Sequence, residues 1–441
     1  MASREHFASK IGFILAAAGS AIGIGAIWKF PYMVGTNGGS VFILLFIICT
    51  LLLGLPILIA EFMIGRRGQA SAIQSFQKQA SNRPWFLVGW LGVITSGLIL
   101  SFYSVVGGWI LSYLMRALTF SLSGQGIDFS QLFQQVIENP IEVVIAQGVF
   151  MLITLLIVQA GIKDGIEVAS KWIMPLLFIF FVLLCIRSLT LDGAMEGVRF
   201  MFVPDWSYFN GETFLMALGQ AFFSLSVGIC IMITYASYLP KKENIVNSGV
   251  NVAIMNIIIS LLAGLVIFPA VFALGYSPTE GPGLVFMMIP AVFEQLPFGQ
   301  ILLIIFFILL LFATLTSAIS LLEVVISNSI GERTYLRKKA SWLLATIIFI
   351  VGIPSALSFG VLSNVTIFNK PIFDFIDYLT NSIAMPIGAF FISLFVGYHY
   401  KKQITQQELQ TAPLLFTIWY IIVRYIAPVA ISIILIRGII S

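Results

Sequence analysis

Three glycines in the first apolar segment belong to the part of this chain best suited to bind an ion. Gly19, Gly23 and Gly25 interrupt the run LAAAGSAIGIGAIWKFPY at residues 15–32. Unwound backbone at membrane depth is tolerated only where it is buried in protein or lines a cavity. Its free N–H groups bind an anionic group, helped by the helix dipole, and its carbonyl oxygens bind a cation such as sodium. The interruption therefore predicts a site for a cation and a small charged molecule.

A later segment carries hydroxyl groups at helical spacing. Ala313, Thr316, Ser317 and Ser320 lie at i, i+3, i+4 and i+7 and share one face of a helix. In isolation such hydroxyls are expected to bond back to carbonyls of their own helix. Beside an unwound helix they complete a cation site, and this is the interpretation we adopt.

A second interruption occurs in FFSLSVGI, at residues 222–229. Its Ser224, Ser226 and Gly228 are poor helix formers. Small residues in membrane helices often serve only close packing. Here, however, the interruption recurs in the first helix of two successive five-helix blocks. That recurrence is typical of secondary transporters built from inverted repeats, whose binding site lies between discontinuous helices.

The elements that must position these residues are membrane spans. Of the 441 residues, 59% are hydrophobic and 10% are charged, against about 25% charged in soluble domains. Runs of roughly 20 apolar residues, each able to cross ~30 Å of hydrocarbon, recur along the chain. We expect an all-α polytopic membrane protein with one transmembrane domain over 1–441. The predicted helices are 11–34, 40–64, 87–118, 142–160, 165–188, 212–239, 245–275, 299–330, 340–358, 371–398 and 413–438.

Charge distribution predicts the orientation of the chain in the inner (plasma) membrane. With a cytoplasmic N-terminus, the inside segments hold 16 basic residues and the outside segments hold 5, as the positive-inside rule requires. An odd number of spans then predicts an extracytoplasmic C-terminus. The N-terminal MASREHFASK leads into the first span without a processing site. The three cysteines lie in apolar runs and are expected to be buried thiols, and two histidines are too few for a metal site.

The interrupted segments also carry a family resemblance. GSAIGIGAIWKFPY, NGGSVF, GLPILIAEFMIGR, QAFFSLSVG, ITYASY and ATLTSAIS stand in the order and at the spacing of the neurotransmitter:sodium symporter family, and the chain resembles its bacterial eleven-helix branch. The resemblance implies the leucine-transporter fold, with inverted repeats at 11–188 and 212–398, discontinuous helices 1 and 6, and an extra helix at 413–438. It implies sodium-driven symport of a small amine or amino acid by alternating access, and no enzymatic activity. The expected partners are that substrate and the lipid bilayer, with no nucleic acid.

The resemblance also implies the site residues. Tyr103 and the N–H groups of Ile24 and Gly25 are expected to bind a substrate carboxylate. The second sodium site is expected to use Gly19, Ile22, Ala313, Thr316 and Ser317. The substrate pocket is expected to be lined by Ala21, Ile24, Gly25, Ile99, Tyr103, Phe223, Ser224, Ser226, Ile229, Ser317 and Leu321.

Gly23 indicates the class of substrate. The monoamine members of the family place an aspartate there, because an amine without a carboxylate needs one from the protein. A glycine favours a substrate that brings its own carboxylate, and the apolar side chains of Ile99, Ile229 and Leu321 favour a neutral, hydrophobic amino acid.

The first sodium site departs from the family pattern. Ala21, Ser224 and Asn256 match it, but Ala26 replaces an asparagine and removes one oxygen ligand. At the family's chloride site Phe46 replaces a tyrosine, and no carboxylate stands in for the anion. We therefore expect one or two sodium ions, a weak or absent first site, and no strict requirement for chloride.

Charged residues within or beside the spans predict two gates. Lys29 and Asp377 match the family's outer pair, with lysine in place of arginine. Arg4, Tyr238 and Glu323 resemble the cytoplasmic gate, and Glu332 is the nearest acidic partner for Arg4. In helix 5, Gly165 and Pro175 have the spacing of a stretch that unwinds to admit water to the second sodium site.

Three alternatives share this scaffold. A channel would require rings of pore-lining groups, which the asymmetric pocket does not resemble. A non-transporting amino acid sensor would keep the pocket and lose the gates, which here are mostly present. Proton coupling is the third, with Glu323 as the candidate carrier.

Overall fold

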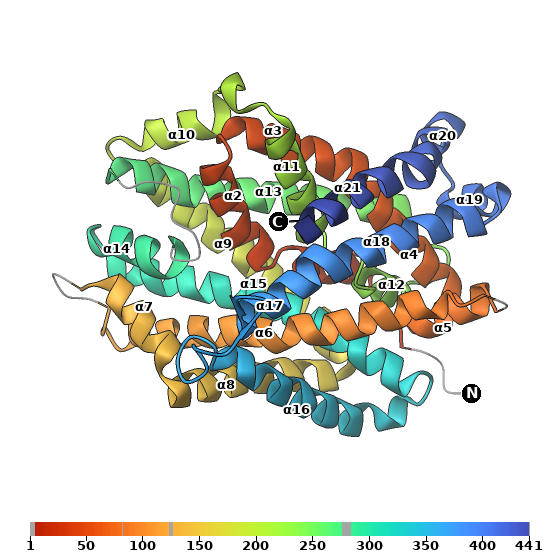
Figure 1. The fold of residues 1–441 in the computed structure, drawn as a ribbon, viewed down its shortest axis with the longest axis horizontal. Coiled ribbons are helices and arrows are strands. Elements are labelled where there is room, and N and C mark those ends of the chain that lie inside the picture. The colour runs from red at the N-terminus through yellow and green to blue at the C-terminus, as the bar shows by residue number, and fades with distance from the viewer. Residues whose placement is uncertain (1–4, 82, 123–126, 276–283, 441) are drawn as a thin grey trace.

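A computed structural model describes residues 5–81, 83–122, 127–275 and 284–440. The fold is helical, and most helices run roughly along the long axis of the molecule (Figure 1). Within the described ranges, nine helices are long and apolar enough to cross a membrane, and a tenth span is formed by a bent pair. An interrupted sixth span completes the predicted set of eleven. The all-α fold is therefore confirmed.

The first five spans and their connections follow the predicted order. They are α1 (Lys10–Ala21) with α2 (Phe30–Thr36), α3 (Ser40–Cys49) with α4 (Leu55–Gly68), α6 (Phe86–Leu118), α8 (Pro140–Gln159) and α9 (Val168–Leu189). The connections contain the short helices α5 (Ala72–Gln79), α7 (Phe129–Glu138) and α10 (Ala194–Phe202), and a single 3-10 turn at Trp206–Tyr208.

The second half repeats this pattern and adds one span. Its spans are α11 (Gly211–Ser224) with α12 (Ile231–Ala236), α13 (Ile245–Ala273), α15 (Gly299–Ile330), α16 (Arg337–Ala356), α17 (Ile372–Asp377) with α18 (Met385–Leu394), and α20 (Pro413–Ile421) with α21 (Ala427–Ile440). The connections hold α14 (Ile289–Glu294), α19 (Lys402–Leu409), a 3-10 turn at Thr334–Leu336, and a hairpin of β1 (Thr366–Ile367) and β2 (Lys370–Pro371).

Several helices contain a π-helical turn, in which an extra residue widens the coil. These turns lie at Gly25–Lys29, Thr50–Gly54, Ile162–Glu167, Leu284–Met288, Tyr378–Ala384, Phe395–His399 and Ile422–Ile426. The predicted helix ends differ from the observed ones by only a few residues: the second span ends at Gly68 and not at 64, and the sixth ends at Ala236 and not at 239. There the chain turns through Ser237, Tyr238 and Leu239.

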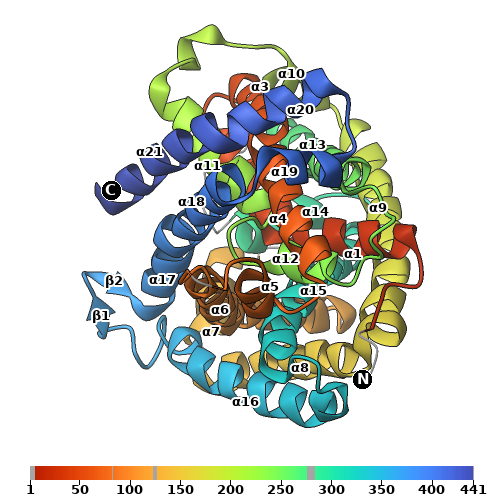
Figure 2. The same ribbon diagram turned by 90° about the vertical axis from the view of Figure 1, so that its right-hand side faces the viewer.

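Both predicted interruptions are present. The two halves of the first span meet at an angle of 53° across residues 22–24. The sixth span breaks between Ser224 and Ile231. Helix α1 packs against α13, α15 and α9, and α12 packs against α4 and α15. Viewed from the end, α1 and α12 lie inside the bundle, while α8, α9 and α16 form part of its rim (Figure 2). The broken backbone is thus shielded from lipid.

Candidate functional site

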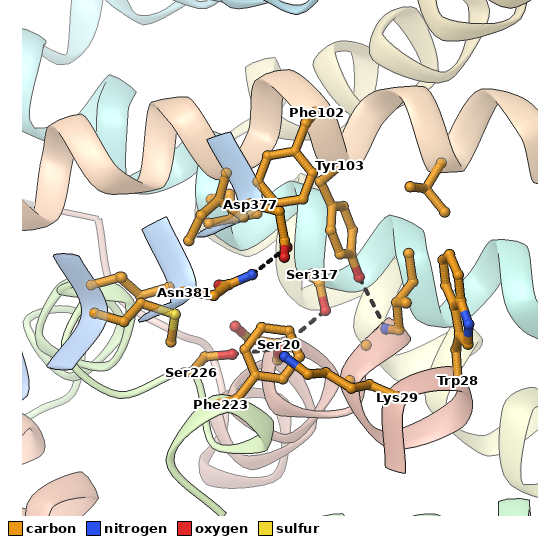
Figure 3. A pocket seen from close by; sticks show the side chains of 18 of the residues that line it. Ser20, Trp28, Lys29, Phe102, Tyr103, Phe223, Ser226, Ser317, Asp377 and Asn381 are labelled. Atoms are coloured by element: carbon orange, nitrogen blue, oxygen red, sulfur yellow. Dashed lines mark hydrogen bonds between the residues drawn. The ribbon is translucent and has the colours of Figure 1, made fainter. Parts of the chain in front are cut away.

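A cavity of about 340 Å³ lies between the two interrupted spans and helices α6, α15, α17 and α18 (Figure 3). Most of its lining side chains are apolar. Ten of the eleven residues expected in the substrate pocket line it: Ala21, Ile24, Gly25, Ile99, Tyr103, Phe223, Ser226, Ile229, Ser317 and Leu321.

The break in the first span presents its main chain to this cavity. The N–H of Ile24 donates to the hydroxyl of Tyr103 at 3.1 Å. The carbonyl oxygen of Ser20 accepts from Ser226 at 3.1 Å and from Ser317 at 3.0 Å. One unwound turn is therefore held by side chains from three other spans, which satisfy backbone groups that lipid would leave unpaired.

The break in the sixth span is held in a similar way. Gly228 has a φ of +93°, and a Cβ there would run into the backbone of Met385. Its N–H donates to the carboxylate of the fully buried Glu61 at 2.6 Å. The carbonyl of Ile229 accepts from Ser96 at 2.9 Å. Only glycine fits this left-handed, closely packed position.

Two glycines of the first span leave room for the neighbouring side chains. A Cβ on Gly23 would lie 2.7 Å from the Tyr103 oxygen and even closer to the Ser317 hydroxyl. A Cβ on Gly25 would lie 2.7 Å from the ring of Phe223. In this conformation, a side chain at position 23 would have to displace the hydroxyls of Tyr103 and Ser317.

The charged residues of the cavity come from α17 and the end of the first break. Lys29 and Asp377, the predicted outer gate, both line the cavity. The Lys29 ammonium lies 4.2 Å from the centroid of the Phe223 ring, and Asp377 accepts from Asn381 at 2.5 Å (Figure 3). Among the ion pairs of the described residues, none joins Lys29 to Asp377. Both side chains therefore face the same cavity, but no ion pair between them closes it.

The predicted second sodium site brings α15 against the first span. The Ser317 hydroxyl lies 3.0 Å from the Ser20 oxygen and 3.5 Å from the Gly19 oxygen. The Thr316 hydroxyl donates to Ala313 of its own helix at 2.9 Å. One hydroxyl thus bonds back within α15 while its neighbour crosses to the broken helix. Ile22, the fifth expected residue, caps the end of α1 and is fully buried. Hydroxyl and main-chain carbonyl oxygens are the ligands that suit a sodium ion at such a break.

The predicted first sodium site is only partly assembled. Asn256 donates to the Ser224 hydroxyl at 3.0 Å, and its own amide oxygen is buried without a partner. Ala26 is fully buried and supplies no side-chain oxygen. Ala21 lines the neighbouring cavity.

The placement of Ser224 corrects the expected pocket lining. Its side chain does not line the cavity, because Ser224 ends α11 and its hydroxyl bonds to Ala221 at 3.3 Å and accepts from Asn256 on α13.

Two of the three residues predicted for the cytoplasmic gate, Tyr238 and Glu323, lie together in the structure, and the third, Arg4, lies outside the described residues. Tyr238 donates to the fully buried Glu323 at 2.6 Å, as the pairing of the two residues suggested. The cation paired with Glu323 is Arg337, at the start of α16, which the charge count assigned only to a loop. Arg337 also donates twice to the carbonyl of Val158, at 2.8 and 3.1 Å.

The predicted pairing of Arg4 with Glu332 stays a prediction, because Arg4 lies outside the described residues. Within the described residues, Glu332 pairs with Lys78 at 3.6 Å. Glu332 lies just beyond the end of α15, where it reaches α5.

The N-terminal segment is tied to helix 5 by two glutamates, which the sequence analysis missed. Glu5 accepts from the N–H of Ile162 at 2.7 Å. Glu167 accepts from the N–H of Ala8 at 2.6 Å and from the Ser9 hydroxyl at 2.8 Å. These contacts cover the N-terminal end of α1.

Helix 5 is helical across the stretch that was predicted to unwind. Gly165 lies in the π-helical turn, and Pro175 lies inside α9. Met174, next to the proline, is close to the second sodium site, because its sulfur would lie 3.1 Å from a Cβ on Gly19.

Other residues that line the cavity were also missed. Phe102 and Val106 share the face of α6 that carries Ile99 and Tyr103, so helical spacing would have identified them. Asp374 and Asn381 lie at i−3 and i+4 of the predicted gate residue Asp377, so the same spacing would have identified them. The remaining lining residues are Ser20, Trp28, Tyr32, Ile231, Phe373 and Met385.

Comparison with known proteins agrees with this geometry. The model of the sodium:neurotransmitter symporter family matches residues 4–136 and 129–441. The uncharacterized sodium-dependent transporter YhdH of Bacillus subtilis is 49% identical over 99% of this chain and 98% of its own. An uncharacterized sodium-dependent transporter of Haemophilus influenzae is 37% identical over 99% and 98%. The crystal structure of MhsT in complex with L-phenylalanine is 45% identical, with a TM-score of 0.91 over 99% of this chain and 100% of that one. The chain therefore belongs to the sodium:neurotransmitter symporter family, whose members are sodium-coupled transporters and not enzymes.

Proposed function

We propose that this chain takes up a neutral, hydrophobic L-amino acid together with sodium by alternating access. The observation that carries the proposal is the packing around Gly23, where a protein carboxylate would have to displace the hydroxyls of Tyr103 and Ser317. A substrate bound there must bring its own carboxylate. The Ile24 N–H and the Tyr103 hydroxyl, 3.1 Å apart, are the donors that would receive it.

The rest of the cavity supports an apolar substrate side chain. Ile99, Ile229 and Leu321 come from three different spans and carry no polar side-chain atom. The volume of about 340 Å³ accommodates a bulky side chain. MhsT, whose fold matches this chain closely, was crystallised with L-phenylalanine. These observations favour an aromatic or large aliphatic amino acid.

Sodium would bind beside this substrate at the second site. Ser317 contributes to both, because it lines the cavity and its hydroxyl reaches the main chain of the first span. A cation held there would stabilise the broken conformation that forms the substrate pocket, which is a physical basis for coupling. The first site lacks the oxygen that Ala26 replaced, so we propose that coupling depends mainly on the second site and that chloride is not required.

Proton coupling through Glu323 is disfavoured by its surroundings. The carboxylate is fully buried, pairs with Arg337 and accepts from Tyr238. Protonating it would leave a buried guanidinium without its counter-charge, which is strongly destabilising.

The test is uptake of radiolabelled L-phenylalanine and L-leucine into proteoliposomes holding the purified protein. Sodium, proton and chloride gradients are imposed one at a time. We expect accumulation above equilibrium only with an inward sodium gradient, unchanged when gluconate replaces chloride. Substrate binding without uptake would identify a sensor. Equilibration without accumulation would identify a channel. Accumulation driven by a proton gradient in sodium-free buffer would show proton coupling.

The membrane orientation has a separate test. We propose a cytoplasmic N-terminus and an extracytoplasmic C-terminus in the inner membrane. Single cysteines placed at the two ends of a cysteine-free variant should react with an impermeant reagent added to intact cells only at the C-terminal end.

A further inference from the structure

Arg424 is a charged residue in the last span that the transport site does not use. It lies in the π-helical turn that joins α20 to α21. Charged side chains within membrane spans are costly and mark a functional partner by default. Among the described residues, no carboxylate forms an ion pair with Arg424.

Three tyrosine rings surround the guanidinium. Its central carbon lies 4.7 Å from the ring centroid of Tyr398, 5.4 Å from that of Tyr425 and 5.7 Å from that of Tyr420. One terminal nitrogen donates to the Tyr420 hydroxyl at 2.7 Å, while the buried Nε atom has no hydrogen-bond partner among the residues that the structure describes. Aromatic faces attract a cation but do not neutralise its charge.

The arginine is held in place and not free to extend into water. The Tyr420 hydroxyl that accepts from Arg424 donates in turn to the carbonyl of Gly397 at 3.3 Å. A Cβ on Gly397 would lie 2.9 Å from the Arg424 Cα, so the two helices are in close contact. The guanidinium is therefore positioned by packing before any ligand arrives.

The same cluster lies at the edge of the membrane span. Gly397 and Tyr398 belong to the last turn of the tenth span, which ends at His399. Lys402 begins α19 directly afterwards, and its ammonium lies 5.7 Å from the Tyr420 ring centroid. Tyr398 is 52% exposed and Tyr425 is 54% exposed, so the cluster faces outward and not into the bundle.

We propose that Arg424 and Lys402 bind the phosphate of an anionic phospholipid in the leaflet that the charge count assigns to the cytoplasm. A guanidinium matches a phosphate through two parallel N–H donors. Tyrosines favour the depth at which lipid headgroups lie. Basic residues at the cytoplasmic surface attract anionic lipids. The lipid supplies the counter-charge that the described part of the chain lacks.

The occupant that competes with a lipid is an acidic residue of a second copy of this chain. The second cation, Lys402, favours the lipid, because it lies against the same Tyr420 ring as Arg424 and directly follows the end of the tenth span, where lipid headgroups are reached. The test below distinguishes the two occupants.

The experiment measures lipid binding to the purified full-length protein by native mass spectrometry. Phosphatidylglycerol and phosphatidylcholine are added separately to delipidated samples. The variants are Arg424→Gln and Lys402→Gln. The control is Arg437→Gln, because Arg437 lies in the same span at the opposite end and already pairs with Glu212 at 2.7 Å.

We expect each test variant to weaken the tightest phosphatidylglycerol site roughly fivefold, the effect of about 1 kcal/mol per basic residue near the membrane. Phosphatidylcholine binding and the control should be unchanged. Arg424→Lys, which keeps the charge, should lose less affinity than Arg424→Gln, and it serves as the second variant if glutamine lowers the midpoint of thermal unfolding. Unchanged phosphatidylglycerol affinity in both Arg424 variants would overturn the proposal. Loss of a dimer at constant lipid affinity would assign the counter-charge to a second copy.

Discussion

Replacing Tyr103 by phenylalanine tests the proposed substrate site most directly. The substitution removes one oxygen atom and keeps the ring that lines the cavity. In this structure that oxygen accepts from the Ile24 N–H at 3.1 Å. When an amino acid binds, the same hydroxyl should turn and donate to the substrate carboxylate.

The expected loss follows from the charge of that carboxylate. A hydrogen bond to a charged group contributes about 1.5–3 kcal/mol, so the dissociation constant for the amino acid should rise about 10- to 150-fold. The Ile24 N–H faces the cavity, where water can replace the lost acceptor, so the protein itself should remain stable. The sodium affinity of the second site should change less than the amino acid affinity, because Tyr103 is not one of the residues expected to bind that ion, although its hydroxyl interacts with that of Ser317.

The assay is equilibrium binding of radiolabelled L-phenylalanine, or of the amino acid that the uptake screen identifies, at saturating sodium. Tyr113→Phe is the matched control. Tyr113 lies on the same helix, is fully buried, and its hydroxyl has no hydrogen-bond partner. Its removal should leave binding unchanged. A change of less than threefold in Tyr103→Phe, or an equal loss in the control, would refute the assignment of the carboxylate to this end of the cavity.

Three further predictions concern the inner gate, the sodium sites and helix 5. Glu323→Gln should destabilise the protein by about 3–5 kcal/mol because it leaves Arg337 buried without its counter-charge. Thermal unfolding measures this loss of stability. As the control, the double variant that also carries Arg337→Gln should lose less stability than Glu323→Gln alone. Ser317→Ala should raise the sodium concentration for half-maximal uptake about tenfold, the effect of losing one ligand of about 1.4 kcal/mol, and the wild-type sodium titration should have a Hill coefficient near one. A coefficient near two that Asn256→Ala lowers would contradict a weak first site. Pro175→Ala should slow transport and leave equilibrium substrate binding unchanged. Alanine restores the backbone N–H donor that proline lacks, so it disfavours unwinding of helix 5. An unchanged uptake rate would argue against the unwinding of helix 5.

The sequence by itself determined the spans and their breaks. In lipid, an apolar run of membrane length can form little other than a helix, so the order of the helices followed from the positions of these runs along the sequence. Glycines and serines at the centre of two such runs marked the breaks, because weak helix formers recur in the first helix of both five-helix blocks. The proposed class of substrate rests on a single residue, Gly23, interpreted through the family resemblance.

Tertiary structure decided which charged groups meet. Arg337 was counted as a loop residue, yet it pairs with the buried Glu323, because the turn after α15 directs the start of α16 back into the bundle. Arg424 had no explanation until Tyr398, on another span, was found beside it. Side chains such as Ile231 and Met385 enter the cavity from apolar stretches that the sequence does not distinguish from ordinary packing segments. Periodicity reports which face of a helix is apolar, but it carries no information about which distant helix packs there, and the pairing of charges depends on that packing.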